Sequence, residues 1–142
     1  MGYRVVLDTS VLVKWFRQGE VLADHALRWR DAYLEGEIEI AVPSLAAYEL
    51  ANVLRYKDDL TTAQVEEAVQ SLFDMRLKWV APSASTVRRA VAIAREREVT
   101  VYDAVFVSLA EALGADLVTA DERLVRRLSG FPFVHLLGAQ PS

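Results

Sequence analysis

Short apolar segments alternate with longer amphipathic segments along nearly the whole chain, and this alternation limits the fold more than any other feature. The apolar segments, interpreted as strands, cover residues 4–8, 38–42, 77–81, 116–120 and 132–137. The amphipathic segments, interpreted as helices, cover about 10–17, 21–34, 43–56, 61–75, 83–99, 101–115 and 121–130. Strands that alternate with helices predict an α/β fold, in which helices cover both faces of a mostly parallel central sheet as three layers.

The composition is that of one domain with a well-filled core. The chain has 142 residues, of which 53% are hydrophobic. Sixteen basic residues against twenty acidic ones leave a net charge of −4, which argues against non-specific DNA binding through a positively charged coat. There is no cysteine, so disulfides, thiolate zinc sites and a cysteine nucleophile are excluded.

The sequence carries no sign of a membrane segment. The opening stretch MGYRVVLD lacks the apolar core of a signal peptide because Asp8 interrupts it, and no uncharged apolar stretch approaches twenty residues. We therefore expect a soluble, cytoplasmic protein that makes no contact with a membrane.

Four acidic residues stand in apolar surroundings. Asp8 ends the first predicted strand, Asp121 follows the fourth, and Glu49 is the only charge before Arg55 in its helix. Glu49 lies within two turns of a helix that leaves the carboxyl end of a strand, so we expect these three acids to share one edge of the sheet, the edge at which ligands bind in parallel sheets. Asp103 begins a strongly apolar helix, and topology alone does not place it.

Each of these acids also has a purely structural interpretation. Asp8 and Asp121 are suited to cap the helices that follow them. Asp103 lies three residues after Thr100, which is the spacing of a capping box. The structural interpretation is weakest for Glu49, because burying an unpaired carboxylate in the middle of a helix is costly.

Carboxylates gathered in one crevice repel one another, so they must either take up protons or hold a cation. Oxygen ligands favour Mg²⁺ or Mn²⁺, and such ions assist the hydrolysis of phosphodiester bonds. Other chemistries find no support, since the chain has neither a G-x-S-x-G motif nor a phosphate-binding P-loop. Its two histidines, His25 and His135, are not spaced as metal ligands.

Several motifs together resemble the PIN-domain nucleases, and specifically the VapC-type toxins. They are VVLDTSVLV, VPSLAAYELANVL and VYDAVFVSLAEALGADLVTAD, the last followed by ERL, and they span nearly the whole chain in order. The resemblance implies a three-layer α/β/α PIN-like domain, which we place at residues 1–137 with a C-terminal tail at 138–142. It also implies a Mg²⁺-dependent endoribonuclease whose catalytic, metal-binding acids match Asp8, Glu49, Asp103 and Asp121.

The same resemblance implies supporting residues and partners. Thr9, Ser10 and Thr119 match hydroxyl residues that line the site in this family, and we expect them to orient carboxylates or metal-bound waters. VapC-type proteins act as toxins of type II toxin–antitoxin pairs, form homodimers and are silenced by a VapB-type antitoxin.

An RNA substrate must approach this acidic site, so cations that bind phosphate are expected around it. The candidates are Lys14, Arg17, Arg55, Lys57 and Arg123, each of which could equally be solvated helix surface.

Two alternatives remain open on the sequence. One is a PIN-domain nuclease of RNA maturation or decay that has no antitoxin, and a neighbouring small gene would distinguish it from a toxin. The other is an inactive PIN fold that binds RNA or protein, against which the presence of all four acids counts.

Overall fold

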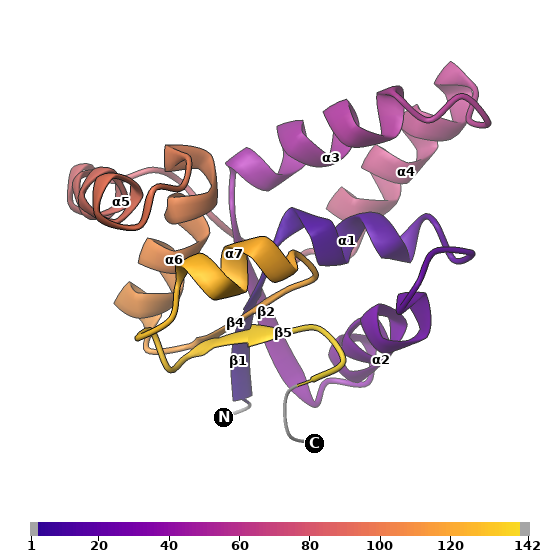
Figure 1. The fold of residues 1–142 in the computed structure, drawn as a ribbon. Coiled ribbons are helices and arrows are strands. Elements are labelled where there is room, and N and C mark those ends of the chain that lie inside the picture. Colours follow the sequence, from indigo (N-terminus) through magenta and orange to yellow (C-terminus); the bar gives the residue numbers. More distant parts are fainter. Residues whose placement is uncertain (1–2, 140–142) are drawn as a thin grey trace.

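A five-stranded sheet forms the centre of the computed structural model, which describes residues 3–139. The strand order is β3-β2-β1-β4-β5, and every neighbouring pair is parallel (Figure 1). The strands are β1 (Tyr3–Leu7), β2 (Ile38–Pro43), β3 (Lys78–Val80), β4 (Asp116–Thr119) and β5 (Val134–Leu136). The prediction of a mostly parallel sheet is confirmed.

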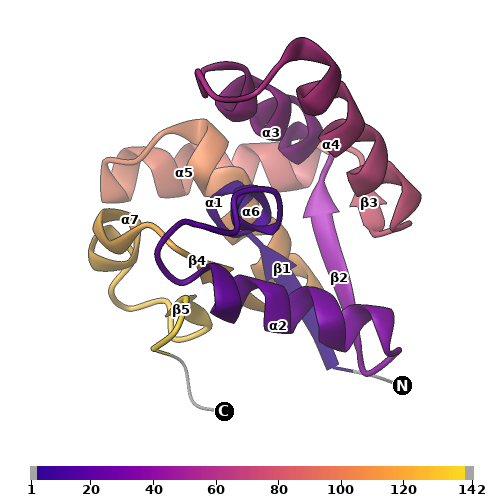
Figure 2. The same cartoon turned by 90° about the vertical axis from the view of Figure 1, so that its right-hand side faces the viewer.

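All seven predicted helices are present and cover the sheet on both sides. They are α1 (Thr9–Trp15), α2 (Ala23–Leu34), α3 (Leu45–Arg55), α4 (Thr62–Asp74), α5 (Ala84–Arg97), α6 (Val101–Leu113) and α7 (Glu122–Arg127). Figure 1 shows α6 on one side of β1 and β2 and α2 on the other, and Figure 2 shows α2 crossing in front of these strands. The predicted three-layer α/β/α fold is therefore confirmed.

Most element boundaries differ from the prediction by one to three residues, and two of these differences have local backbone reasons. Pro43 was expected to open a helix, but it pairs with Val80 as the last residue of β2, and α3 begins two residues later. The helix expected from residue 21 begins instead at Ala23, because Leu22 adopts a left-handed conformation with φ of 65°. A residue in that conformation cannot continue a right-handed helix.

The core is densest around the central strand. Val5, Val6 and Leu7 of β1 are fully buried, as are Leu117 of β4 and Phe106 of α6. A strand covered on both faces is expected to be continuously apolar, and β1 has this character. Where β1 ends, the chain is therefore fixed by packing on both sides, which positions Asp8.

The last strand of the sheet, β5, is short, and few residues follow it in the described part of the chain. β5 ends at Leu136, and the predicted tail at 138–142 begins just beyond it, with residues 140–142 outside the described part of the chain. The domain boundary at 137 remains a prediction. None of the helices within residues 3–139 has the length and apolar character needed to cross a bilayer.

Candidate active site

The four predicted acids line one cavity of about 500 Å³ at the carboxyl edge of the sheet. Asp8 follows β1, Asp121 lies two residues beyond the end of β4, and Glu49 lies in α3. The prediction that these three acids share one edge is confirmed. Asp103 joins them because α6 leads into the parallel strand β4, so the start of α6 lies at the carboxyl edge.

Asp8 is held by hydroxyl groups from two elements. Its side chain is buried, with the residue only 6% exposed. Ser10 Oγ donates a hydrogen bond of 2.6 Å to Asp8 Oδ2, and Thr119 Oγ1 donates one of 2.8 Å to the same oxygen. Although Asp8 occupies the N-cap position of α1, its side chain makes no capping hydrogen bond. Capping of α1 therefore does not account for the direction of the Asp8 side chain, although Asp8 holds the N-cap position.

Both hydroxyl groups are themselves oriented by backbone donors. Ser10 Oγ accepts a hydrogen bond of 2.9 Å from the Ala120 N–H, and Thr119 Oγ1 accepts one of 3.1 Å from the Asp121 N–H. Since each hydroxyl has a single proton, and Asp8 receives it, the Ser10 and Thr119 oxygens at 3.3 Å from each other do not bond mutually. The result is a fixed arrangement in which both protons point at one carboxylate oxygen.

Thr9 orients a second acid, Glu49, in the same way. Its Oγ1 donates a hydrogen bond of 2.7 Å to Glu49 Oε1, which connects the start of α1 to α3. Thr9 is 6% exposed, so this bond is largely shielded from water. All three predicted hydroxyl residues thus lie beside the acids, and two of the four acids are oriented by them.

The remaining two acids lie at helix starts. Asp121 Oδ1 accepts a hydrogen bond of 3.1 Å from the Leu124 N–H, so Asp121 caps α7 while it lines the cavity. At α6 the cap is Thr100, whose Oγ1 accepts a bond of 3.0 Å from the Asp103 N–H. The structural interpretation thus holds for Asp121, and half of the suspected capping box is present at Asp103.

Burial raises the pKa of Asp8, Glu49 and Asp103, and repulsion from neighbouring acids adds to the effect at Glu49 and Asp103. Burial, and then the charges of Asp8 and Asp103, raise the pKa of Glu49 to about 7 despite the opposing bond from Thr9. Burial followed by the charge of Asp8 raises the pKa of Asp103. Burial also raises the pKa of Asp8, and the bonds from Ser10 and Thr119 counteract part of that effect. This electrostatic conflict would be relieved by a cation.

The donors fit a hard divalent cation. The acid and hydroxyl groups of the cavity offer oxygen atoms alone, the ligands that Mg²⁺ and Mn²⁺ prefer. Within residues 3–139, no three acidic or histidine side chains already converge as a metal cage. An ion that keeps several of its waters and takes one or two carboxylates is compatible with this spacing, and Mg²⁺ binds proteins in that way.

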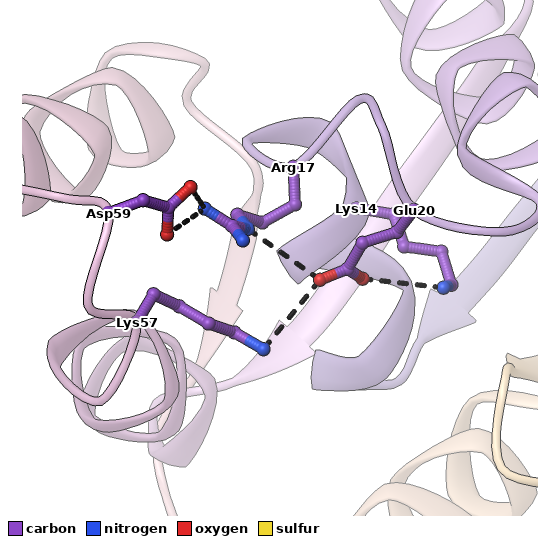
Figure 3. Close-up of polar contacts among 5 residues, drawn as sticks. All are labelled: Lys14, Arg17, Glu20, Lys57 and Asp59. Atoms are coloured by element: carbon purple, nitrogen blue, oxygen red, sulfur yellow. Dashed lines mark hydrogen bonds and ion pairs between the residues drawn. The ribbon is translucent and has the colours of Figure 1, made fainter.

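Two of the five predicted cations lie at the cavity. Lys14 and Lys57 line it, whereas Arg17, Arg55 and Arg123 are not among its lining residues. Arg55 instead lies over the ring of the adjacent Tyr56, with its guanidinium carbon 4.4 Å from the ring centroid. Arg17 forms ion pairs with acidic residues beside the cavity (Figure 3).

Two further polar residues, Glu20 and Asn52, line the cavity and were not among the predicted site residues. Asn52 lies three positions after Glu49 on α3, and that helical spacing could have identified it. Glu20 lies in the connection between α1 and α2, where no periodic pattern signals the direction of a side chain.

Residues 5–129 match the PIN domain, and the chain belongs to this family. It is 36% identical to ribonuclease VapC3 of Pyrobaculum aerophilum over 96 residues, which are 63% of this chain and 71% of that relative. The predicted resemblance to the PIN-domain and VapC proteins is confirmed.

Solved structures agree on the fold. One is PAE2754 from Pyrobaculum aerophilum, with a TM-score of 0.71 and 20% identity over 95% of this chain and 84% of that one. Another is a toxin–antitoxin complex from Klebsiella pneumoniae, with a TM-score of 0.67 and 19% identity over 92% of this chain and 94% of that one. At these identities the likeness establishes the fold alone.

Proposed function

We propose that this chain is a Mg²⁺- or Mn²⁺-dependent endoribonuclease and the toxin of a type II toxin–antitoxin pair. The observation that carries the proposal is the meeting of four carboxylates in one cavity, two of them oriented by the three hydroxyl residues. The 36% identity to a protein named ribonuclease VapC3 supports the choice of RNA as substrate.

In this proposal the metal lies in the cavity lined by Asp8, Glu49, Asp103 and Asp121, where an ion would take one or two of these carboxylates directly and reach the others through its waters. A divalent cation supplies an activated water nucleophile and neutralises charge on the leaving oxygen. The chain supplies orientation, because Ser10 and Thr119 fix one oxygen of Asp8. Hydrogen bonds of this kind behind a metal ligand restrict its rotation and raise metal affinity.

The substrate's phosphates need positive charge near the acids. Lys14 and Lys57 provide it at the cavity itself, and they are the first candidates for direct contact with RNA. Arg55 and Arg123 lie outside the lining and would contact RNA only where it extends beyond the cavity, whereas Arg17 contacts Glu20 of the lining and lies at its edge.

The test is cleavage of a mixed RNA pool by the purified chain, with Mg²⁺ or Mn²⁺ and with EDTA. We expect products with either ion and none with the chelator, and loss of product formation in Asp8→Asn, Glu49→Gln, Asp103→Asn and Asp121→Asn. Glu66→Gln is the matched control, because Glu66 is an exposed residue of α4 that does not line the cavity. Undiminished cleavage in EDTA would falsify the metal-dependent reaction.

The toxin role has a separate test in cells. Expression of the chain alone should slow growth, and co-expression of the small protein encoded beside it should restore growth. The toxin–antitoxin complex among the structural neighbours supports this pairing. RNA cleavage without toxicity, or without a neighbouring protein that binds the chain, would favour a nuclease of RNA maturation.

We also propose that the chain forms a homodimer. A second cavity of about 460 Å³, with mostly apolar lining, includes residues of α3, α5 and α6. Tyr48 and Tyr102 line it while 76% and 62% exposed, which favours a protein partner over solvent. Sedimentation should give a dimer for the parent chain and a monomer for the double variant with Tyr48→Asp and Tyr102→Asp. A monomeric parent chain would contradict the proposal.

A further inference from the structure

A single carboxylate, that of Glu20, faces three cations beside the candidate active site (Figure 3). Glu20 Oε1 lies 3.5 Å from Lys14 Nζ, and Oε2 lies 3.7 Å from both Arg17 Nε and Lys57 Nζ. Lys14 of α1 and Arg17 of the loop after it are near Glu20 in the sequence, whereas Lys57 comes from the loop after α3 and is brought to Glu20 by the fold. We call these four residues the Glu20 cluster.

Three of the four residues of the Glu20 cluster belong to the lining of the acidic cavity. Lys14, Glu20 and Lys57 line that cavity together with the four candidate metal ligands. Three positive charges face one negative charge in the cluster, and Asp59 adds a second through its pair with Arg17. The cluster therefore keeps a positive excess beside the four acids of the cavity, which would offset their repulsion of a polyanion.

The two acids that contact these cations do so very differently. Arg17 donates hydrogen bonds of 2.8 and 2.7 Å to the two oxygens of Asp59, which fixes the guanidinium. The Glu20 contacts are longer, at 3.5 to 3.7 Å, and are shared among three partners. Long, divided ion pairs at a partly exposed site contribute little to folding and exchange readily. Glu20 thus occupies the space between the cations without binding any of them closely.

We propose that Glu20 is a built-in competitor for RNA phosphate, so that a phosphate of the substrate displaces its carboxylate from Lys14, Arg17 and Lys57 as RNA enters the cavity. This inference rests on the proposed function and adds to it the place where the substrate backbone is held. A phosphodiester carries one negative charge and two free oxygens, as a carboxylate does, so the exchange leaves the charge of the cluster unchanged. Glu20 then lowers the affinity of the site for RNA.

The decisive measurement is RNA affinity as a function of salt. A labelled single-stranded RNA is titrated with the chain in Mg²⁺, with Asp8→Asn present in every protein so that cleavage does not interfere. We expect Glu20→Gln to bind about three- to tenfold more tightly at low salt, because the freed cations bind phosphate directly. The plot of log affinity against log salt concentration should steepen by about one unit, since one more counterion is released.

The matched control is Asp58→Asn, which removes the same charge from the same region. Asp58 is exposed, adjoins Lys57 and makes no ion pair within residues 3–139. We expect it to change neither affinity nor salt dependence appreciably. Lys57→Gln should act in the opposite direction to Glu20→Gln, with weaker binding and a shallower salt dependence.

The inference is overturned if Glu20→Gln binds RNA no more tightly than Asp58→Asn does. If Glu20→Gln does not fold, Glu20→Asp takes its place, because its shorter side chain draws the carboxylate away from the cations. An affinity of Glu20→Asp for RNA equal to that of the parent then overturns the inference as well. A purely structural Glu20 would lower the melting temperature on substitution and leave the salt dependence unchanged. If the parent chain binds no RNA, the proposed function itself is contradicted. If the parent binds RNA and substitution of Glu20 does not change the affinity, only the inference about Glu20 fails.

Discussion

Thr119 Oγ1 donates a hydrogen bond of 2.8 Å to Asp8 Oδ2 and so joins two residues that are 111 positions apart. The backbone repeats the connection, since the Asp8 N–H donates a bond of 3.0 Å to the Val118 carbonyl. Strands β1 and β4 lie side by side in this register, with Leu7 opposite Val118. The candidate ligand Asp8 is therefore oriented by the sheet and by a side chain at the same time.

We predict that Thr119→Val lowers both stability and metal affinity. Valine preserves the branched shape but removes a donor to a buried carboxylate, which should cost about 1–3 kcal/mol of unfolding free energy. Metal affinity or cleavage should fall roughly 10–100-fold, as for other residues that orient a ligand. Urea denaturation and a Mg²⁺ titration measure the two effects. Thr119→Ser is the control, because it keeps the hydroxyl, and equal behaviour of the two variants would contradict the prediction.

We predict that Asp8→Asn removes cleavage without destabilising the chain in chelator. The Asn carbonyl oxygen can accept the bonds from Ser10 and Thr119, while one negative charge leaves a group of acids that repel one another. The variant should melt at the same temperature as the parent or higher in EDTA at neutral pH. Mg²⁺ should raise the melting temperature of the parent more, because an ion bound to the folded state stabilises it. Retained cleavage would contradict a metal role for Asp8.

Glu49 should make the metal-free chain less stable as the pH rises. Its pKa is raised from 4.5 to about 7 in the folded state, mainly by burial and then by Asp8 and Asp103. Between these two values the folded chain binds more protons than the unfolded chain, so stability is lost as pH increases. Glu49→Gln should reduce this loss by about 1–2 kcal/mol between pH 5 and 8, after allowance for solvent screening.

The pH experiment is urea denaturation of the parent and Glu49→Gln in EDTA at several pH values. Part of the slope should persist in the variant, because the pKa values of Asp8 and Asp103 are raised as well. Parallel stability profiles for the two proteins would show that Glu49 titrates normally.

Thr61→Ala should reduce stability and leave the site intact. Thr61 caps α4 by accepting a bond of 3.1 Å from the Gln64 N–H, and the Gln64 side chain accepts one of 2.8 Å in return. Loss of such a cap costs about 1 kcal/mol. Because neither residue lines the cavity, the rate of RNA cleavage should equal that of the parent at a temperature where both proteins are folded. A fall in cleavage would mean that α4 supports the site.

Much of this arrangement could be predicted because the spacing of apolar residues follows directly from the geometry of helices and strands. The alternating pattern identified all five strands and seven helices, and it placed Asp8, Glu49 and Asp121 at one edge. Asp103 could have been placed as well, since a helix that leads into a parallel strand must start at the carboxyl edge. What the pattern did not resolve were exact ends, such as Pro43, where pairing with a neighbouring strand decides the conformation.

The contacts made by side chains in loops could not be predicted from the sequence, for a physical reason. Glu20 lies outside regular structure, so no period predicts which way its carboxylate points. Arg17 is likewise a plain surface cation in the sequence, and only the folded chain brings Asp59, 42 positions away, to its guanidinium. Lys14 and Lys57 do line the cavity, but nothing in the sequence indicated their contacts with Glu20, and their role in RNA binding stays a prediction.

The central place of β1 in the sheet also has a consequence for the chain while it is being synthesised. Of the five strands of the sheet, β1 is synthesised before the other four, yet its neighbour β4 ends only at Thr119. A nascent chain that stops before α6 contains Asp8 and Glu49 but lacks Asp103, Thr119 and Asp121. Fragments left by interrupted translation thus carry an incomplete set of acids, and a cell that makes the proposed toxin is exposed to its activity only after nearly all of the domain has been translated.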